Sequence, residues 1–206
     1  MMRFLKSKLE KFIIFCIKNY NENETLRILK DSGIKMNSSS SIKSPLQIGG
    51  GKFIEIGENT TIGKYAWIEA IENYIDQSFH PSISIGSHIN IGNFTCITAI
   101  NNIRIEDGCL ISEHVYISDH SHGMNPSTNL RPVLQNLYSK GKVVIGQNTF
   151  IGMRVSILPG VTIGKNCIIG AHSVVNHSFP DFCMISGIPA KLIKKYNPVS
   201  GMWEPV

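Results

Sequence analysis

An aliphatic residue returns every six positions between Ile48 and Val175, and this period restricts the possible folds more than any other feature of the chain. A helix has a period of about 3.6 residues and a half-buried strand a period of 2, so neither produces this spacing. The period predicts a coil with three short sides, in which the aliphatic residue at the head of each hexad points inward. The cleanest run of heads is Ile145, Ile151, Ile157, Ile163, Ile169 and Val175.

The other places of the hexad are also restricted. A glycine often follows the head, and we expect it to permit the geometry of the corner. The fifth place holds a small or β-branched residue, which predicts that Cys109 and Cys167 are interior fillers. Roughly fifteen hexads predict about five coils, stacked about 4.8 Å apart. The predicted class is therefore all-β, a parallel β-helix.

Two segments interrupt the repeat, at residues 70–82 and 120–142. The second contains Pro126 and Pro132 and has no hexad. Loops longer than about 12–15 residues are uncommon in compact domains and are usually functional, so we expect the chemistry at 120–142. The predicted organisation is an N-terminal cap and linker at 1–45, a β-helix at 46–180 and a tail at 181–206.

The N-terminal segment predicts helix. Apolar residues recur at helical spacing among lysines, and a shorter helix is expected from Asn23 to Gly33. We expect either a cap over the open first coil or a basic amphipathic surface that touches a membrane. Residues 38–41 are expected to be linker. The apolar and basic residues of the first helix are Leu5, Lys6, Lys8, Leu9, Lys11, Phe12, Ile13, Cys16, Lys18 and Tyr20.

Composition excludes several classes of protein. Hydrophobic residues make up 42% and charged residues 17%, which is unlike a disordered chain. No apolar run approaches the roughly 18 residues of a membrane span. The net charge of +5 comes without a basic stripe interleaved with aromatics, which argues against nucleic-acid binding. Five cysteines without a CxxC pair favour reduced thiols, and we expect a soluble, cytoplasmic protein.

Five longer motifs stand out within and just after the repeat. They are Ile-Ser-Asp-His-Ser-His-Gly (117–123), Ile-Gly-Gln-Asn-Thr-Phe-Ile-Gly (145–152), Ile-Leu-Pro-Gly-Val-Thr-Ile-Gly (157–164), Ile-Gly-Ala-His-Ser-Val-Val (169–175) and Gly-Ile-Pro-Ala-Lys-Leu-Ile-Lys (187–194). These motifs resemble those of the left-handed β-helix acyltransferases of the hexapeptide-repeat superfamily, and above all the sugar O-acetyltransferases of capsule, exopolysaccharide and lipopolysaccharide assembly. The resemblance implies a left-handed coil, acetyl-CoA as acyl donor, no metal, a sugar or glycan acceptor and a homotrimer with its donor site between subunits.

His122 stands out among the seven histidines because the chain leaves the repeat at Gly123, which places His122 at the root of the long loop. The resemblance implies that His122 is the catalytic base. Histidine, with an ordinary pKa near 6.5, can take the proton of an attacking hydroxyl. His120 is expected to support the site, and Asp119, Glu113 or a backbone carbonyl to orient the imidazole. His88, His114 and His172 occupy the fourth place of their hexads and are expected to face solvent.

The resemblance also implies a set of donor positions. Phe150 stands where relatives commonly have Trp. Phenylalanine keeps the aromatic face for stacking but lacks the indole N–H donor, so backbone N–H groups are expected to form the oxyanion site. The lysines would bind the phosphates of the coenzyme, with Lys195 beside them. The implied positions are Phe150, Met153, Ala171, Asn176, His177, Lys191 and Lys194.

Three alternatives stay open from the sequence. One is an amino-sugar N-acetyltransferase. Another is a zinc enzyme of the γ-carbonic-anhydrase type, for which His172 and His177 have suggestive spacing and which needs three converging histidines. The third is a β-helix protein that only binds a partner. The sequence does not name the acceptor sugar.

Overall fold

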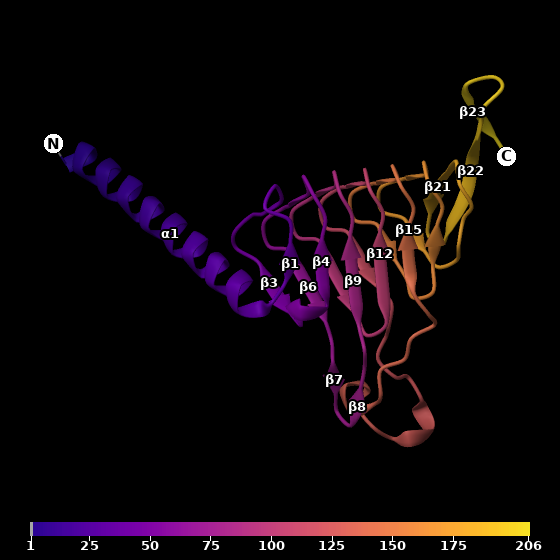
Figure 1. Cartoon of the computed structure of the whole chain (residues 1–206), viewed down its shortest axis with the longest axis horizontal. Coiled ribbons are helices and arrows are strands. Elements are labelled where there is room, and N and C mark those ends of the chain that lie inside the picture. The colour runs from indigo at the N-terminus through magenta and orange to yellow at the C-terminus, as the bar shows by residue number, and fades with distance from the viewer. Residues whose placement is uncertain (1) are drawn as a thin grey trace.

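The computed structural model describes residues 2–206, and it describes side chains from residue 10 onward. One helix is followed by a coil whose three sides form three parallel sheets (Figure 1). The structure is consistent with a hexapeptide-repeat left-handed β-helix. Sheets A and C each contain six strands, so six coils stack rather than the expected five.

The strands of the coil are short and follow one another in the order A, B, C. Sheet A contains β1 (Lys35–Met36), β4 (Ile54–Ile56), β9 (Ser82–Ile85), β12 (Asn102–Ile105), β15 (Val143–Ile145) and β18 (Thr162–Ile163). Sheet B begins with β2 (Ser41–Ile42), β5 (Thr61–Ile62), β10 (Asn90–Ile91), β13 (Leu110–Ile111), β16 (Phe150–Ile151) and β19 (Ile168–Ile169). Sheet C contains β3 (Gln47–Gly49), β6 (Trp67–Ala70), β11 (Cys96–Ala99), β14 (Tyr116–Ser118), β17 (Ser156–Ile157) and β20 (Val174–Val175).

The remaining elements lie outside this regular coil. In sheet B, β21 (Cys183–Gly187) pairs in parallel with β19, and β22 (Ala190–Asn197) and β23 (Met202–Pro205) then add an antiparallel end. A separate hairpin pairs β7 (Asn73–Tyr74) with β8 (Gln77–Ser78). Three short 3₁₀ helices are η1 (Gly51–Phe53), η2 (Pro126–Thr128) and η3 (Pro132–Leu134).

The hexad heads form the core, as the sequence predicts. Every head of the clean run is fully buried, and so are the fifth-place residues, including Cys109 and Cys167. Heads of successive coils pair directly, so that Ile117 lies beside Ile157, which lies beside Val175. Parallel register therefore stacks aliphatic side chains into one continuous apolar column.

The expected role of the second-place glycines is wrong. Their φ angles are not in the left-handed region; instead a Cβ at Gly63 would lie 2.6 Å from the amide nitrogen of Asn93 in the next coil. Glycine is needed there because neighbouring coils approach closely. The corner itself is formed at the fourth place, where His88, His114 and His172 have φ between 57° and 59° and face solvent.

The N-terminus differs from expectation in three ways. A single helix, α1 (Met2–Ser32), replaces the two predicted, and it projects away from the coil (Figure 1). Because α1 projects away from the coil (Figure 1), the consecutive residues Phe12, Ile13, Ile14 and Phe15 are all exposed. Successive residues point in different directions around a helix, so these four form no single apolar face. Leu5, Lys6, Lys8 and Leu9 lie outside the residues whose side chains are described.

The first coil begins earlier than residue 46. β1 pairs with β4 and β2 pairs with β5 in parallel, so residues 38–41 form part of a coil instead of a linker. Its heads Met36, Ile42 and Ile48 keep the six-residue spacing, but Asn37 and Lys43 follow the first two heads in place of glycine, which makes β1 and β2 hard to recognise in the sequence. Among residues 2–206, no helix combines the length and apolar content needed to cross a bilayer.

Replacing Ile157 by Asp should unfold the protein. Ile157 is fully buried in the apolar column, and a carboxylate there would have no partner, at a cost of several kcal/mol out of a total stability of roughly 5–15 kcal/mol. Thermal melting followed by circular dichroism measures the effect. Thr162→Asp, on an exposed outward position next to a head, serves as the control and should melt near the parental temperature. An unchanged midpoint for Ile157→Asp would contradict the register.

The buried thiols should be inert in the folded protein. Desolvation by burial raises the pKa of Cys109 and of Cys167 to about 11, so both stay protonated between pH 8 and pH 10. Iodoacetamide followed by peptide mass spectrometry should label the exposed Cys16 within minutes, and Cys109 and Cys167 only after denaturation. Labelling of Cys109 at the rate of Cys16 without denaturant would show that the core is open.

Candidate active site

The departures from the hexad period gather at one corner of the coil. This corner, which we call the C–A corner, connects a strand of sheet C to the next strand of sheet A. The β7–β8 hairpin, the two extra residues Ile100 and Asn101, and the loop 120–142 all leave the coil there. The hairpin and the loop extend together from one side of the molecule (Figure 1). A rigid scaffold thus places the irregular segments in contact.

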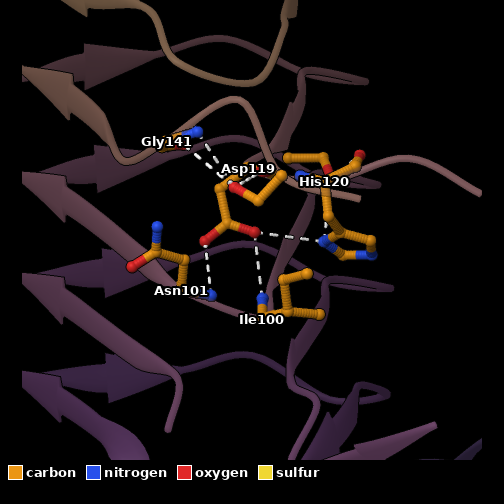
Figure 2. A network of polar contacts seen from close by, with 7 residues as sticks. Ile100, Asn101, Asp119, His120 and Gly141 are labelled. Carbon is orange, nitrogen blue, oxygen red and sulfur yellow. Dashed lines mark hydrogen bonds and ion pairs between the residues drawn. The ribbon is translucent and has the colours of Figure 1, made fainter. Parts of the chain in front are cut away.

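Asp119 anchors the root of the long loop. Its side chain is fully buried, and its carboxylate accepts hydrogen bonds from the backbone N–H groups of Ile100 and Asn101, both at 2.9 Å (Figure 2). These two N–H groups are available because the extra residues widen the corner of the coil beneath. The hydroxyl of Ser139 donates to the backbone carbonyl of Asp119 and secures the other end of the loop.

His120 is held by the same carboxylate. Its Nδ1 lies 3.1 Å from Oδ1 of Asp119 (Figure 2). The same nitrogen lies 3.3 Å from the hydroxyl of Ser118. The side chain is only 11% exposed. Since a carboxylate oxygen accepts, Nδ1–H of His120 donates to it, and Nε2 is left for a ligand. Asp119 therefore orients His120 and does not contact the expected base, His122.

His122 is exposed and lies against the hairpin. Its Nδ1 is 3.2 Å from the hydroxyl of Tyr74, and the two rings meet edge to face with centroids 5.5 Å apart. Glu113 does not reach His122, because it accepts a hydrogen bond from the side chain of Asn93 at another corner. Tyr74 is the residue that the sequence interpretation missed. Its only signal was a position in the out-of-phase segment 70–82.

The hairpin and the long loop are fastened to each other. The side-chain oxygen of Gln77 accepts from the amide of Leu137 at 2.7 Å, and its nitrogen donates to the carbonyl of Leu137 at 3.2 Å. Within the loop, Ser121 and Tyr138 form an antiparallel bridge. These contacts fix the segment that carries both histidines.

His120 and His122 line one pocket of about 450 Å³. Its floor is the outward face of sheet C, where Trp67 and Tyr116 are about two-fifths exposed and the indole N–H of Trp67 donates to Glu69 at 2.9 Å. Its rim comes from the hairpin and the loop. The other lining residues are Ile71, Asn73, Tyr74, Cys96, Thr98, Ser121 and Leu137.

The donor positions implied by the resemblance lie near the C-terminal end of the coil, outside this pocket. Met153 and Ala171 follow sheet B in adjacent coils, and Phe150 and Lys194 fall in one cross-strand row of sheet B and its antiparallel end. Asn176 and His177 follow β20 at the C–A corner and contact each other at 2.9 Å. Lys191 is exposed on β22. One chain therefore spreads these positions over sheet B and two corners of the coil.

The geometry does not assemble a metal site from one chain. Within the part of the chain that the structure describes, no group of three or more His, Cys, Asp or Glu side chains lies close enough to hold a metal ion. His172 and His177 follow different sheets, B and C respectively.

Comparison with known proteins identifies the class. The family model described as "Bacterial transferase hexapeptide (six repeats)" matches residues 142–177. The chain is 35% identical over 169 residues to a putative lipopolysaccharide biosynthesis O-acetyl transferase, WbbJ, of Escherichia coli K12, covering 79% of this chain and 82% of that protein. The chain therefore belongs to the hexapeptide-repeat transferase family and is an acyltransferase, and the resemblance seen in the motifs is confirmed.

Other relatives agree with this class. The chain is 33% identical over 149 residues to the galactoside O-acetyltransferase of Escherichia coli K12, covering 66% of this chain and 64% of that protein. A crystal structure of a point mutant of AntD, an N-acyltransferase from Bacillus cereus, in complex with dTDP and coenzyme A superposes with a TM-score of 0.67 at 24% identity, covering 82% of this chain and 88% of that one. This last likeness concerns the fold.

Proposed function

We propose that the protein is an acetyl-CoA-dependent O-acetyltransferase that acetylates a sugar hydroxyl during cell-surface polysaccharide synthesis. The observation that carries the proposal is the pocket at the C–A corner, where His120 and His122 lie beside an aromatic floor. The relative WbbJ is named for O-acetyl transfer in lipopolysaccharide biosynthesis, which supports the same class of acceptor here. The proposal includes a left-handed coil and a cytoplasmic homotrimer, in which the donor lies between subunits.

The pocket suits a sugar ring. The rings of Trp67 and Tyr116 offer apolar faces, and Glu69 offers carboxylate oxygens that accept from hydroxyl groups. A binding site for a small polar molecule combines these two features, apolar walls and a few polar groups that fix orientation. The acceptor hydroxyl would lie between this floor and the histidines at the rim.

His122 acts as the general base. As the acceptor oxygen attacks the thioester carbonyl carbon, the imidazole takes the hydroxyl proton; the new C–O bond forms, the C–S bond breaks, and the proton passes to the departing sulfur. His120, held by Asp119, presents a ring nitrogen that can bind the acceptor. Backbone N–H groups stabilise the charge on the carbonyl oxygen.

The donor would bind along the C-terminal half of the coil. Ala171 is exposed and small, which permits close approach of the pantetheine arm to the backbone. Phe150 and Met153 are also exposed and supply apolar contact, while Asn176 and His177 supply polar contact. Lys191 and Lys194 on β22 would bind the phosphates. A peripheral membrane contact through α1 belongs to the same proposal, since its apolar residues are exposed and lysines flank them.

Removing the base should abolish most turnover. His122→Ala should lower kcat by roughly 10²–10⁴-fold, the usual contribution of a positioned general base, while His120→Ala costs less than about tenfold. Thiol release from acetyl-CoA in the presence of candidate sugars measures turnover. Each sugar is tested beside the corresponding amino sugar, and mass spectrometry of the products shows whether a hydroxyl or an amino group is acetylated. Melting temperatures should hardly change, because His122 is exposed.

Loss of turnover in His120→Ala with activity kept in His122→Ala would assign the base to His120. Activity in both variants would refute the mechanism.

Removing the C-terminal lysine charges should weaken the binding of acetyl-CoA and leave the binding of the acceptor unchanged. Lys191→Ala with Lys194→Ala should raise the KM for acetyl-CoA several-fold and leave the acceptor KM within about twofold, because the phosphates lie far from the transferred acetyl group. The matched control is Lys43→Ala with Lys64→Ala, at the opposite end of the coil. Steady-state kinetics with each substrate varied in turn separates the two constants. An unchanged donor KM would place the phosphate site elsewhere.

A further inference from the structure

The hydroxyl of Tyr74 stands between the two segments that interrupt the coil. It donates a hydrogen bond to the backbone carbonyl of Val133 at 2.7 Å, and its oxygen lies 3.2 Å from Nδ1 of His122. Tyr74 is half-buried on the β7–β8 hairpin, while Val133 and His122 belong to the long loop. One hydroxyl group on the hairpin therefore contacts two residues of the long loop.

This arrangement determines which nitrogen of His122 carries the proton. A phenol has one proton, and a carbonyl oxygen can only accept, so the proton of Tyr74 points at Val133. The phenolic oxygen can then only accept from the imidazole, which requires a proton on Nδ1. In a neutral imidazole a proton on Nδ1 leaves Nε2 with its lone pair, and the hydrogen-bond network is what assigns the tautomer.

We propose that Tyr74 is a positioning residue that holds His122 in the Nδ1–H tautomer, so that Nε2 is the basic nitrogen. The inference rests on the proposed role of His122 as base. When Nε2 takes the proton of the acceptor hydroxyl, the imidazolium keeps its Nδ1–H bond to the phenolic oxygen. No proton passes to Tyr74, which accepts the same hydrogen bond before and after the transfer.

The attachment of the hairpin to the long loop fixes the position of Tyr74 relative to His122. The two hydrogen bonds between Gln77 and the backbone of Leu137 fasten the hairpin to the loop beside Tyr74. The edge-to-face contact between the rings of Tyr74 and His122 adds a second constraint on ring orientation. His122 thus receives from a tyrosine what His120 receives from the buried carboxylate of Asp119, a fixed acceptor for Nδ1–H.

The direct test is the tautomer itself. Nitrogen-15 spectra of protein labelled at histidine should show His122 with a protonated Nδ1 and a bare Nε2, the resonance being assigned by its loss in His122→Ala. In Tyr74→Phe, which keeps the ring and removes the oxygen, the signal should move towards the Nε2–H form or a mixture. A wild-type spectrum with the proton on Nε2 overturns the inference, even where the variant does not fold.

Kinetics give the second readout. Tyr74→Phe should lower kcat by about 10- to 100-fold, within the roughly 10²–10⁴-fold contribution of a general base, and leave the KM for acetyl-CoA within about twofold. Tyr138→Phe is the matched control, because Tyr138 lies on the same loop and the structure gives its hydroxyl no hydrogen bond within residues 10–206. Its kcat and the His122 spectrum should be unchanged.

The outcomes separate the two proposals. If His122→Ala is inactive while Tyr74→Phe is fully active with an unchanged His122 spectrum, the role of Tyr74 is refuted and the role of His122 as base stands. A fully active His122→Ala refutes His122 as base, while the wild-type spectrum still decides whether Tyr74 fixes its tautomer.

Discussion

The whole structure depends on how closely one coil lies on the next. At Gly63 and at the matching glycine of other hexads, the backbone of one coil would touch even a methyl group placed on its neighbour. This close approach keeps the parallel ladders intact and packs the aliphatic heads of successive coils directly on one another. Because the interior is close-packed, it tolerates almost no change in the size of its side chains. Inserted segments therefore leave the coil at its corners.

Of the three corners, one carries the departures that build the pocket. The extra residues Ile100 and Asn101 present two N–H groups to Asp119, which fixes the start of the long loop, and the hairpin of the coil below reaches the middle of that loop. The order of the pocket therefore comes from specific polar contacts and not from an apolar core of its own. Each histidine has its Nδ1 against a defined oxygen, and the two oxygens come from different coils of the scaffold.

Sequence alone predicted the parts that follow a period. The inward heads, the fifth-place fillers such as Cys167, and the family were all readable because each hexad repeats the same physical requirement. The start of the first coil was missed because Asn37 and Lys43 stand in its second places instead of glycine, although Met36, Ile42 and Ile48 keep the six-residue spacing. The purpose of the second-place glycines was misjudged, since a close approach between coils leaves the same residue in the sequence as a turn with positive φ.

The contacts of the pocket could not be predicted for a different reason. Tyr74 and His122 are 48 positions apart, and nothing in the spacing of either segment encodes their contact. The pairing of Asp119 with His120 and not with His122 depends on the direction of the chain at one corner, where the period has already ended. Position at the root of a loop indicates which histidines matter, but it does not indicate which groups surround them.

Stacked coils also act as a ruler. Two complete coils, β15–β17 and β18–β20, and then strand β21 separate the coil that ends in the histidine loop from β22, which carries Lys191 and Lys194. Each coil adds a fixed step of about 4.8 Å along the axis, so the span between the pocket and these lysines can change only in whole steps. Inserting or deleting one coil would leave each end intact and alter only the span. The number of coils, more than any single contact, would then select the length of a molecule that reaches from one end to the other.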